Sequence, residues 1–203
     1  MRSSSVVAPL LICLVVAGCN SVTANRQVEL GYAMPKLINL CHGYGCKYRS
    51  KLLLDANDGA KFSSILAAGA ASPEAERKAI SQAVRYFDER AYQTTGVRDN
   101  PRADFSGAAK GQMDCIDEST NTHALLLYLS ERGLLRHHKV ERNASRGFFI
   151  DGRYPHATAV ISDPAGVKWV VDSWYAPMGG APDIIPISEW TPRGFLASGA
   201  LDS

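Results

Sequence analysis

The hydrophobic pattern of the chain changes from helical to extended at Gly133, and this change limits the folds that the chain can adopt. Before Gly133, apolar residues recur three and four positions apart; after it, short runs of β-branched and aromatic residues are separated by turn residues. Helices followed by strands predict an α+β fold with an antiparallel sheet. The length of 203 residues suits one domain with a sizeable core.

The clearest predicted helix begins after Ser72. Ser72 is a favoured N-cap residue, Pro73 suits the first helical position, and acidic residues follow in the first turn. Gly96 is placed to end the helix. Between these ends, one apolar stripe recurs at helical spacing and is formed by Ile80, Val84, Phe87 and Ala91. The stretch SSILAAGAA predicts a shorter helix before it.

A second helix is predicted to begin at Cys115. Asp114, followed three residues later by Asp117, is close to the capping-box pattern. Cys115 then occupies about the first helical position, where exposed backbone amides favour a thiolate. The run from residue 124 to 129 is apolar on all sides, so we expect this helix to be central and buried, with Gly133 at its end.

The N-terminus is interpreted as an export signal and not as part of the fold. Arg2 precedes an apolar run over residues 6–17, which is shorter than the ~20 residues of a membrane-spanning helix. The last residues, VAGC, resemble the lipobox of bacterial lipoproteins, which implies cleavage before Cys19 and acylation of its thiol. Asn20 favours the outer membrane, with the protein facing the periplasm. A plain secretory peptide is the alternative.

Cysteine usage leaves one thiol without an obvious partner. Cys13 lies in the signal segment, and Cys19 would carry the lipid. Cys41 and Cys46 are close in sequence, enclose two glycines and lie in an oxidising compartment, which predicts a disulfide. A metal site on the same stretch is an alternative that lacks an obvious fourth ligand. Cys115 remains unpaired, and because such a thiol is prone to oxidation outside the cytoplasm, its presence suggests a use.

A nucleophilic sulfur needs a base, and the base needs a third group that fixes its tautomer. His156 begins one predicted strand and Asp172 lies in the next. The turn SDPAGV between them is typical of a type I turn with a glycine bulge, which pairs Asp163 with Val167. Counting outward from that pair places His156 and Asp172 as diagonal neighbours on one face of the sheet. A register shift of one residue would separate them.

The order Cys115, His156, Asp172 resembles that of the bacterial transglutaminase-like cysteine proteinases, within the papain and transglutaminase fold. DCIDES is similar to the G-D-C-x-D stretch of that family, and HATAVI and WVVDSW look like its histidine and aspartate strands. The resemblance covers roughly residues 75–176. It implies a papain/transglutaminase-like fold with the nucleophile at the N-terminus of a central helix. The chain departs from the pattern at Met113, where the family usually has glycine.

The chemistry of such a triad assigns a role to each residue. Cys115 attacks a carbonyl carbon, His156 takes the thiol proton and returns it to the leaving amine, and Asp172 holds the imidazole. A protonated His156 would also offset the nearby acids. We expect the backbone amide of Cys115 to bind the oxyanion. Gln112 is a weaker candidate for the same task, and a solvent-facing loop glutamine is the alternative.

The remaining histidines and tryptophans are predicted to be structural. We expect His123 to be a hydrogen-bonded core residue, and His137 and His138 to lie on a solvated strand edge. The tryptophans are predicted to pack the sheet: Trp169, Trp174, which is opposite His156, and Trp190. The stretch MGGAPDIIPISEW is expected to form a loop that closes over the cleft.

These observations predict three segments: a lipoprotein signal peptide (1–18), a tether with the disulfide (19–71) and a transglutaminase-like catalytic domain (72–203). The expected protein is a lipid-anchored envelope enzyme that cleaves, or transfers acyl groups from, peptide or amide bonds of a protein or peptide substrate. No metal or organic cofactor is expected. A net charge of +2 without a basic tract argues against nucleic acid. A non-catalytic scaffold or binding lipoprotein is the alternative.

Overall fold

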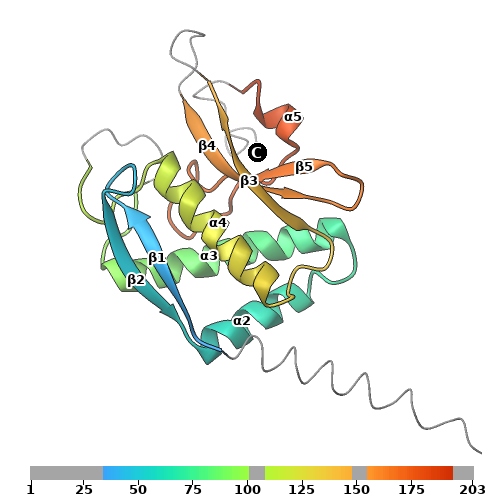
Figure 1. Cartoon of the computed structure of the whole chain (residues 1–203), viewed down its shortest axis with the longest axis horizontal. Coiled ribbons are helices and arrows are strands. Elements are labelled where there is room, and N and C mark those ends of the chain that lie inside the picture. Colours follow the sequence, from blue (N-terminus) through green and yellow to red (C-terminus); the bar gives the residue numbers. More distant parts are fainter. Residues whose placement is uncertain (1–33, 101–107, 148–154, 194–203) are drawn as a thin grey trace, which may run out of the picture.

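The computed structural model describes residues 34–100, 108–147 and 155–193. Within them, helices combine with two small antiparallel sheets, which agrees with the predicted α+β class (Figure 1). Helix α4 lies between a two-stranded hairpin and a three-stranded sheet. The predicted signal segment lies outside the described residues, as does most of GFFI, one of the short runs expected to form strands after Gly133.

The hairpin consists of β1 (Lys36–His42) and β2 (Tyr48–Leu54), paired antiparallel along their whole length. Both strands precede the helices, so the expectation of helices first was wrong for this part of the chain. Alternation explains the strands: Ile38 and Leu40 are buried, whereas Leu37 and Asn39, which precede each of them, are exposed. The tether segment is therefore a folded element in its described part.

Helices α2 (Ala56–Ala67) and α3 (Pro73–Thr95) follow the hairpin. The N-cap of α3 is Ser72, as predicted, and its hydroxyl accepts the Ala75 N–H at 3.1 Å. Gly96 ends α3 in the left-handed conformation, with φ 74°, as glycine does readily.

Helix α2 begins earlier than predicted. Asp55 caps it and accepts the backbone N–H groups of Asn57 and Asp58, while the Asp58 carboxylate accepts the N–H of Asp55. This is a capping box built from two aspartates, a variant of the usual Ser/Thr and Glu/Gln pair.

Helix α4 (Cys115–Glu131) begins at the predicted residue. The Asp114 side chain accepts the N–H groups of Ile116 and Asp117, so Cys115 is the first helical residue. Most of the apolar run is buried, but Leu127 is 42% exposed. The expectation that α4 is covered on all sides was therefore wrong for one face.

The second sheet contains β3 (Lys139–Arg146), β4 (His156–Ser162) and β5 (Lys168–Val171), in the order β3-β4-β5. The β4–β5 turn has the predicted form: the Asp163 N–H donates to the Val167 carbonyl oxygen at 2.9 Å. The register pairs Ser162 with Lys168 and Ala159 with Val171, as the turn predicts. This register sets the relation between His156 and Asp172.

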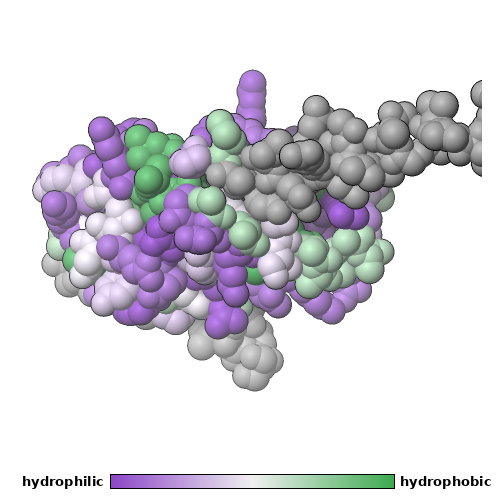
Figure 2. All heavy atoms as spheres, turned by 90° about the horizontal axis from the view of Figure 1, so that it is seen from below, coloured by the Kyte–Doolittle hydropathy of each residue, from purple (hydrophilic) through white to green (hydrophobic). Residues whose placement is uncertain are grey.

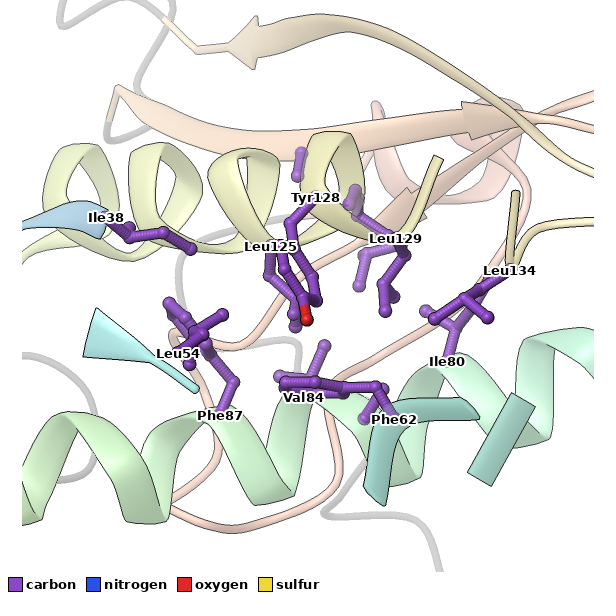
Figure 3. Close-up of a cluster of buried hydrophobic side chains, with 14 of the residues drawn as sticks. Ile38, Leu54, Phe62, Ile80, Val84, Phe87, Leu125, Tyr128, Leu129 and Leu134 are labelled. Carbon is purple, nitrogen blue, oxygen red and sulfur yellow. The ribbon is translucent and has the colours of Figure 1, made fainter. Parts of the chain in front are cut away.

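One continuous core joins the hairpin, the helices and the sheet (Figure 3). In the figure, Leu54 of β2 and Phe62 of α2 meet Val84 of α3 and Leu125 of α4. Residues on both sides of position 72 thus share this core, so the predicted boundary there does not separate two hydrophobic cores.

His138 was wrongly placed at a solvated edge, because it is buried directly before β3. Its Nδ1 lies 2.7 Å from the buried carboxylate of Glu76 in α3. The same carboxylate accepts the backbone N–H groups of Arg136, His137 and His138. Glu76 therefore fixes the connection between α4 and β3 to the start of α3.

The face seen from below is dominated by hydrophilic side chains, with a few hydrophobic ones among them (Figure 2). Leu37 and Leu53 are cross-strand partners on the hairpin and are 49% and 52% exposed. Among the described residues, no helix combines the length and apolarity that a membrane crossing requires.

Candidate active site

Cys115 is a free cysteine at the N-terminus of α4 and is 8% exposed. It packs with Trp174 and Tyr175, which follow β5, and with Ala157 in β4. The residue before Ala157 is His156, and the backbone of Ala157 makes a hydrogen bond that favours the thiolate of Cys115. The helix tip and the beginning of β4 therefore meet at the sulfur.

His156 and Asp172 form the buried pair that the turn register predicts. Nε2 of His156 lies 2.7 Å from Oδ2 of Asp172, and both side chains are at most 2% exposed. Nδ1 of His156 is buried and has no hydrogen-bond partner among the described residues. With a proton on Nε2 held by the carboxylate, Nδ1 carries the lone pair and is the nitrogen available as a base.

Asp172 is held by more than the imidazole. Trp190, in the short helix α5 (Ile187–Trp190), donates its indole N–H to Oδ2 of Asp172 at 2.7 Å. The backbone groups of Asp172 and Asp183 exchange two hydrogen bonds of 2.9 Å. The stretch predicted to close over the cleft thus supplies a second donor to the carboxylate. Trp190 was predicted only to pack the sheet, so this role was missed.

Three aromatic rings surround the imidazole of His156. The ring centroids of Trp174, Tyr175 and Trp190 lie 4.7, 5.3 and 5.6 Å from that of His156. Trp174, predicted to lie opposite His156, has the ring nearest to it of the three. Because the rings exclude water, hydrogen bonds and charges inside this cage interact more strongly than in solvent.

The protonation state of Cys115 differs from expectation. Burial, with the charges of Asp114 and Asp172 as weaker causes, raises the pKa of Cys115 to about 11. The helix amides and the Ala157 backbone do not offset this effect. The expected resting thiolate was therefore wrong: near neutral pH the sulfur carries its proton, and a base must remove it during attack.

Gln112 has other partners than a substrate oxygen. Its side-chain N–H donates to the carbonyl oxygen of Arg98 at 3.0 Å, and its side-chain oxygen accepts the N–H of Asn100 at 3.1 Å. Both polar ends of the side chain thus tie the turn before Cys115 to the segment after α3. This geometry supports neither the oxyanion role nor the solvent-facing alternative.

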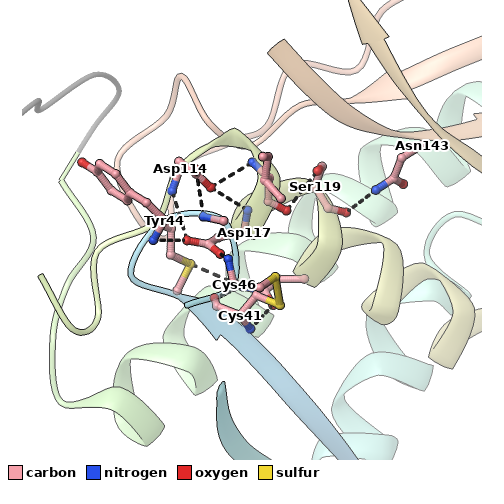
Figure 4. Close-up of a disulfide and its surroundings, with 11 residues drawn as sticks. Cys41, Tyr44, Cys46, Asp114, Asp117, Ser119 and Asn143 are labelled. Carbon is pink, nitrogen blue, oxygen red and sulfur yellow. Dashed lines mark hydrogen bonds between the residues drawn. A yellow bond between two sulfur atoms is a disulfide. The ribbon is translucent and has the colours of Figure 1, made fainter. Parts of the chain in front are cut away.

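The predicted disulfide joins Cys41 to Cys46 and lies against the first turn of α4 (Figure 4). Oδ2 of Asp117 accepts the N–H of Tyr44 at 2.8 Å, and Oδ1 accepts that of Cys46 at 2.5 Å. Tyr44 and Cys46 have φ of 64° and 56°, a left-handed conformation that costs non-glycine residues energy. Asp117 is therefore the group that holds the loop beside Cys115.

The metal-site alternative for this loop is not supported. The two sulfurs are bonded to each other and so do not offer thiolates. His42 lies between them in sequence, and its ring nitrogens meet Ser50 and the N–H of Gly111. Its partners tie β1 to β2 and to the turn before α4.

Met113, the departure from the family pattern, is accommodated by packing. Its side chain is buried, and its sulfur accepts a hydrogen bond from the Asn121 amide at 3.4 Å. Its backbone N–H donates to Oδ1 of Asp99 at 2.6 Å. Asn121 also bonds the backbone of Cys41 twice, so Met113 contacts the residue that links α4 to the disulfide loop.

Several carboxyl groups beside α4 have raised pKa values. Burial is the main cause for each, and mutual repulsion adds to it: the pKa of Glu118 is about 7 and that of Asp99 about 8, and that of Asp88 is also raised. Glu118 accepts the hydroxyl of Ser173 at 2.8 Å, next to Asp172. Near neutral pH these groups carry fewer charges than their number suggests.

His123 lies in α4 two turns beyond the nucleophile. It is half-buried, and its Nδ1 has no hydrogen-bond partner among the described residues, so the expected hydrogen-bonded core histidine was wrong at that atom. No described carboxylate pairs with it, which distinguishes it from His156.

Two surface cavities of the described residues lie away from the predicted catalytic residues. A cavity of 550 Å³ is lined by Arg85 and Met178, and one of 360 Å³ by Trp169; none of the three predicted catalytic residues lines either. Ile116, directly after Cys115, is 49% exposed. The start of α4 is thus at the surface, whereas Cys115 itself is buried.

Comparison with known proteins gives no match: no protein-family model, no curated protein and no solved structure resembles the chain significantly. A function for this site must therefore be argued from its geometry.

Proposed function

We propose that the protein is a thiol acyl-transfer enzyme, with Cys115 as nucleophile, His156 as base and Asp172 as the group that orients the base. One observation carries the proposal: the buried His156–Asp172 pair leaves Nδ1 of His156 unbonded, and the only free cysteine of the described residues, Cys115, lies in a cluster that packs against Ala157, the next residue of β4. An unpartnered nitrogen in an aromatic cage is costly unless something else engages it. The papain/transglutaminase-like fold is part of the proposal.

The proposed reaction transfers the acyl group of a peptide or amide bond to the sulfur. As Sγ of Cys115 attacks the carbonyl carbon, Nδ1 of His156 takes the thiol proton. The same nitrogen then protonates the leaving amine, the C–N bond breaks, and a thioester remains. Water or a second amine resolves the thioester and restores the thiol proton. Asp172, held by Trp190, stabilises the imidazolium in both steps.

The backbone N–H of Cys115 is the proposed oxyanion donor. It belongs to the first turn of α4, whose amides lack acceptors within the helix and point toward incoming negative charge. Because the resting sulfur is a neutral thiol, the site avoids placing a thiolate beside Asp114 and Asp172 before substrate arrives.

A non-catalytic scaffold is the second candidate, and the burial of Cys115 favours it. A cysteine residue that is 8% exposed, with a thiol pKa of about 11, is also what an inert core cysteine shows. The two candidates differ in whether His156 changes the reactivity of the sulfur.

Acetylation by p-nitrophenyl acetate tests the proposed function. We expect the wild-type protein at pH 7 to gain an acetyl group on Cys115 that hydroxylamine removes, as it removes thioesters, and a Cys115→Ala variant to gain none. Peptide mass spectrometry locates the adduct. Loss of the acetyl group that accelerates with added glycinamide would indicate transfer to amines; the scaffold candidate predicts no acetylation of Cys115.

The proposal includes a lipid anchor on Cys19 that holds the enzyme in the bacterial envelope, at the outer membrane facing the periplasm. The VAGC stretch supports this part. Expressed with its leader, the protein is expected to partition into detergent, and a Cys19→Ser variant into the aqueous phase. Equal partition of the wild type and Cys19→Ser would contradict acylation of Cys19 and support the alternative, a plain secretory peptide.

A further inference from the structure

Arg146 is a buried arginine that contacts two walls of the aromatic cage. It is the last residue of β3, pairs in register with His156 and is 6% exposed. Its Nη2 donates to the hydroxyl of Tyr175 at 2.9 Å, and its Nη1 donates to the carbonyl oxygen of Trp190. The guanidinium carbon lies 4.4 Å from the centroid of the Trp190 ring. Arg146 thus joins two rings that reach the site from different segments.

The burial of this guanidinium needs an explanation. No carboxylate of the described residues lies within ion-pair distance of Arg146, whereas buried charges are normally paired. Arg146 instead uses neutral acceptors and a ring face, which hold a planar group in a defined orientation. A side chain selected for stability alone would be replaced by an apolar one at less cost.

The elements that carry Tyr175 and Trp190 have little regular structure of their own. Helix α5 has four residues and no side-chain cap, and Tyr175 lies in the loop after β5. Their positions relative to His156 therefore depend on tertiary contacts, of which those with Arg146 connect both rings to one rigid strand.

We propose that Arg146 is a positioning residue for the Cys115–His156–Asp172 site, acting through Trp190 and Tyr175. Through Trp190 it fixes the indole N–H on Asp172, which keeps the carboxylate aimed at Nε2 of His156. Through Tyr175 it fixes a ring that packs on His156 and belongs to the cluster around Cys115. The result is an imidazole held with its proton on Nε2 and its lone pair on Nδ1. This inference rests on the proposed function.

Arg146→Met tests this role, because methionine retains the volume of the stem and removes both hydrogen bonds and the charge. We expect acetylation of Cys115 to slow about 10- to 100-fold, the cost of misplacing a catalytic group by about an ångström. Arg146→Lys keeps the charge without the planar fork and should recover only part of the rate. The matched control is Arg77→Met: the Arg77 guanidinium lies 3.7 Å from the Trp169 ring, away from the site, and its loss should not alter the rate.

A spectroscopic measurement separates positioning from general stability. With ¹⁵N-labelled histidine, the ring nitrogens of His156 should show one tautomer in the wild type, protonated at Nε2, and a mixture in Arg146→Met. A purely structural role would lower the melting temperature and leave the tautomer of the folded protein unchanged. If Arg146→Met fails to fold, Tyr175→Phe is the second variant. It removes the hydrogen bond between Arg146 and the Tyr175 hydroxyl and should shift the His156 nitrogen signals in the same direction.

The outcomes for Arg146 and for the proposed function are distinguishable. Suppose that Arg146→Met keeps the wild-type acetylation rate and the wild-type His156 tautomer, while His156→Ala is acetylated slowly. This result would overturn the positioning role of Arg146 and still support the proposed function. An unchanged acetylation rate in His156→Ala would contradict the proposed function. The contacts of Arg146 with Trp190 and Tyr175 would then have no catalytic role.

Discussion

Replacing His156 with alanine is expected to slow acetylation of Cys115 about 10²- to 10⁴-fold at pH 7, the usual contribution of a positioned general base. With a pKa of about 11, only ~10⁻⁴ of the thiol is ionised at that pH without help. In the wild type, Nδ1 of His156 takes the proton during attack. In the variant, attack depends on the rare thiolate. The measurement is the rate of adduct formation across pH 6–10.

The dependence of the acetylation rate on pH is a second test of the base role. We expect the His156→Ala rate to rise about tenfold per pH unit up to pH 10, because the thiolate fraction rises in that proportion. The wild-type rate should rise less steeply with pH, because Nδ1 of His156 takes the thiol proton during attack. His123→Ala is the matched control, since within the described part of the chain His123 also has an unbonded Nδ1 but lacks an acid partner. Equal profiles for wild type and His156→Ala would contradict the base role.

The stability of the fold should fall between about pH 4.5 and 7 through the ionisation of Glu118. Burial raises its pKa from 4.5 to about 7 in the folded protein, so the folded state binds more protons than the unfolded state across that interval. The free energy of unfolding therefore decreases as pH rises. This stabilisation is complete below the pKa of Glu118 in the unfolded state and is lost as the pH rises through its pKa in the folded state. Asp99, with a pKa of about 8, extends the fall to higher pH.

A Glu118→Gln variant isolates this effect, because glutamine can still accept the Ser173 hydroxyl but does not ionise. Relative to the wild type, we expect no gain in the free energy of unfolding near pH 4.5. At pH 8 we expect a gain on the order of 3 kcal/mol, because each unit of the rise in pKa from 4.5 to about 7 corresponds to about 1.36 kcal/mol. Urea unfolding at several pH values measures it.

Two features of this comparison make it specific to Glu118. The difference between variant and wild type cancels the contributions of His42 and His123, whose lowered pKa values act in the opposite sense. Glu131→Gln, on an exposed ion pair of the same helix, is the control. A pH-independent difference between Glu118→Gln and the wild type would show that Glu118 has an ordinary pKa.

Local chemistry made part of the site predictable. The SDPAGV turn fixes its own geometry, and through it the register that brings Asp172 to His156. The caps at Ser72 and Asp114 set two helix starts within a few residues of sequence, which placed Cys115 at a helix tip. These features succeed because each depends on backbone hydrogen bonds between near neighbours.

Features that depend on distant contacts were missed. Trp190 reaches Asp172 through a short helix whose sequence shows no strong signal, and Arg146 lies at the end of an ordinary strand. The raised pKa of Cys115 follows from burial by side chains far away in sequence, which outweighs the helix amides at its own position. The two-stranded hairpin was also missed, because the disulfide loop separates two short alternating runs that are weak signals one by one.

The proposed site depends on the proximity of the sulfur of Cys115 to Nδ1 of His156, and a short bifunctional reagent tests it most directly. 1,3-Dibromoacetone first alkylates a thiol and then joins it to a nucleophile within reach of three carbons. We expect one intramolecular link between the peptides that contain Cys115 and His156, absent from His156→Ala and present in His123→Ala. Wild-type protein that carries the reagent on Cys115 alone, or linked to another residue, would contradict the proposed site.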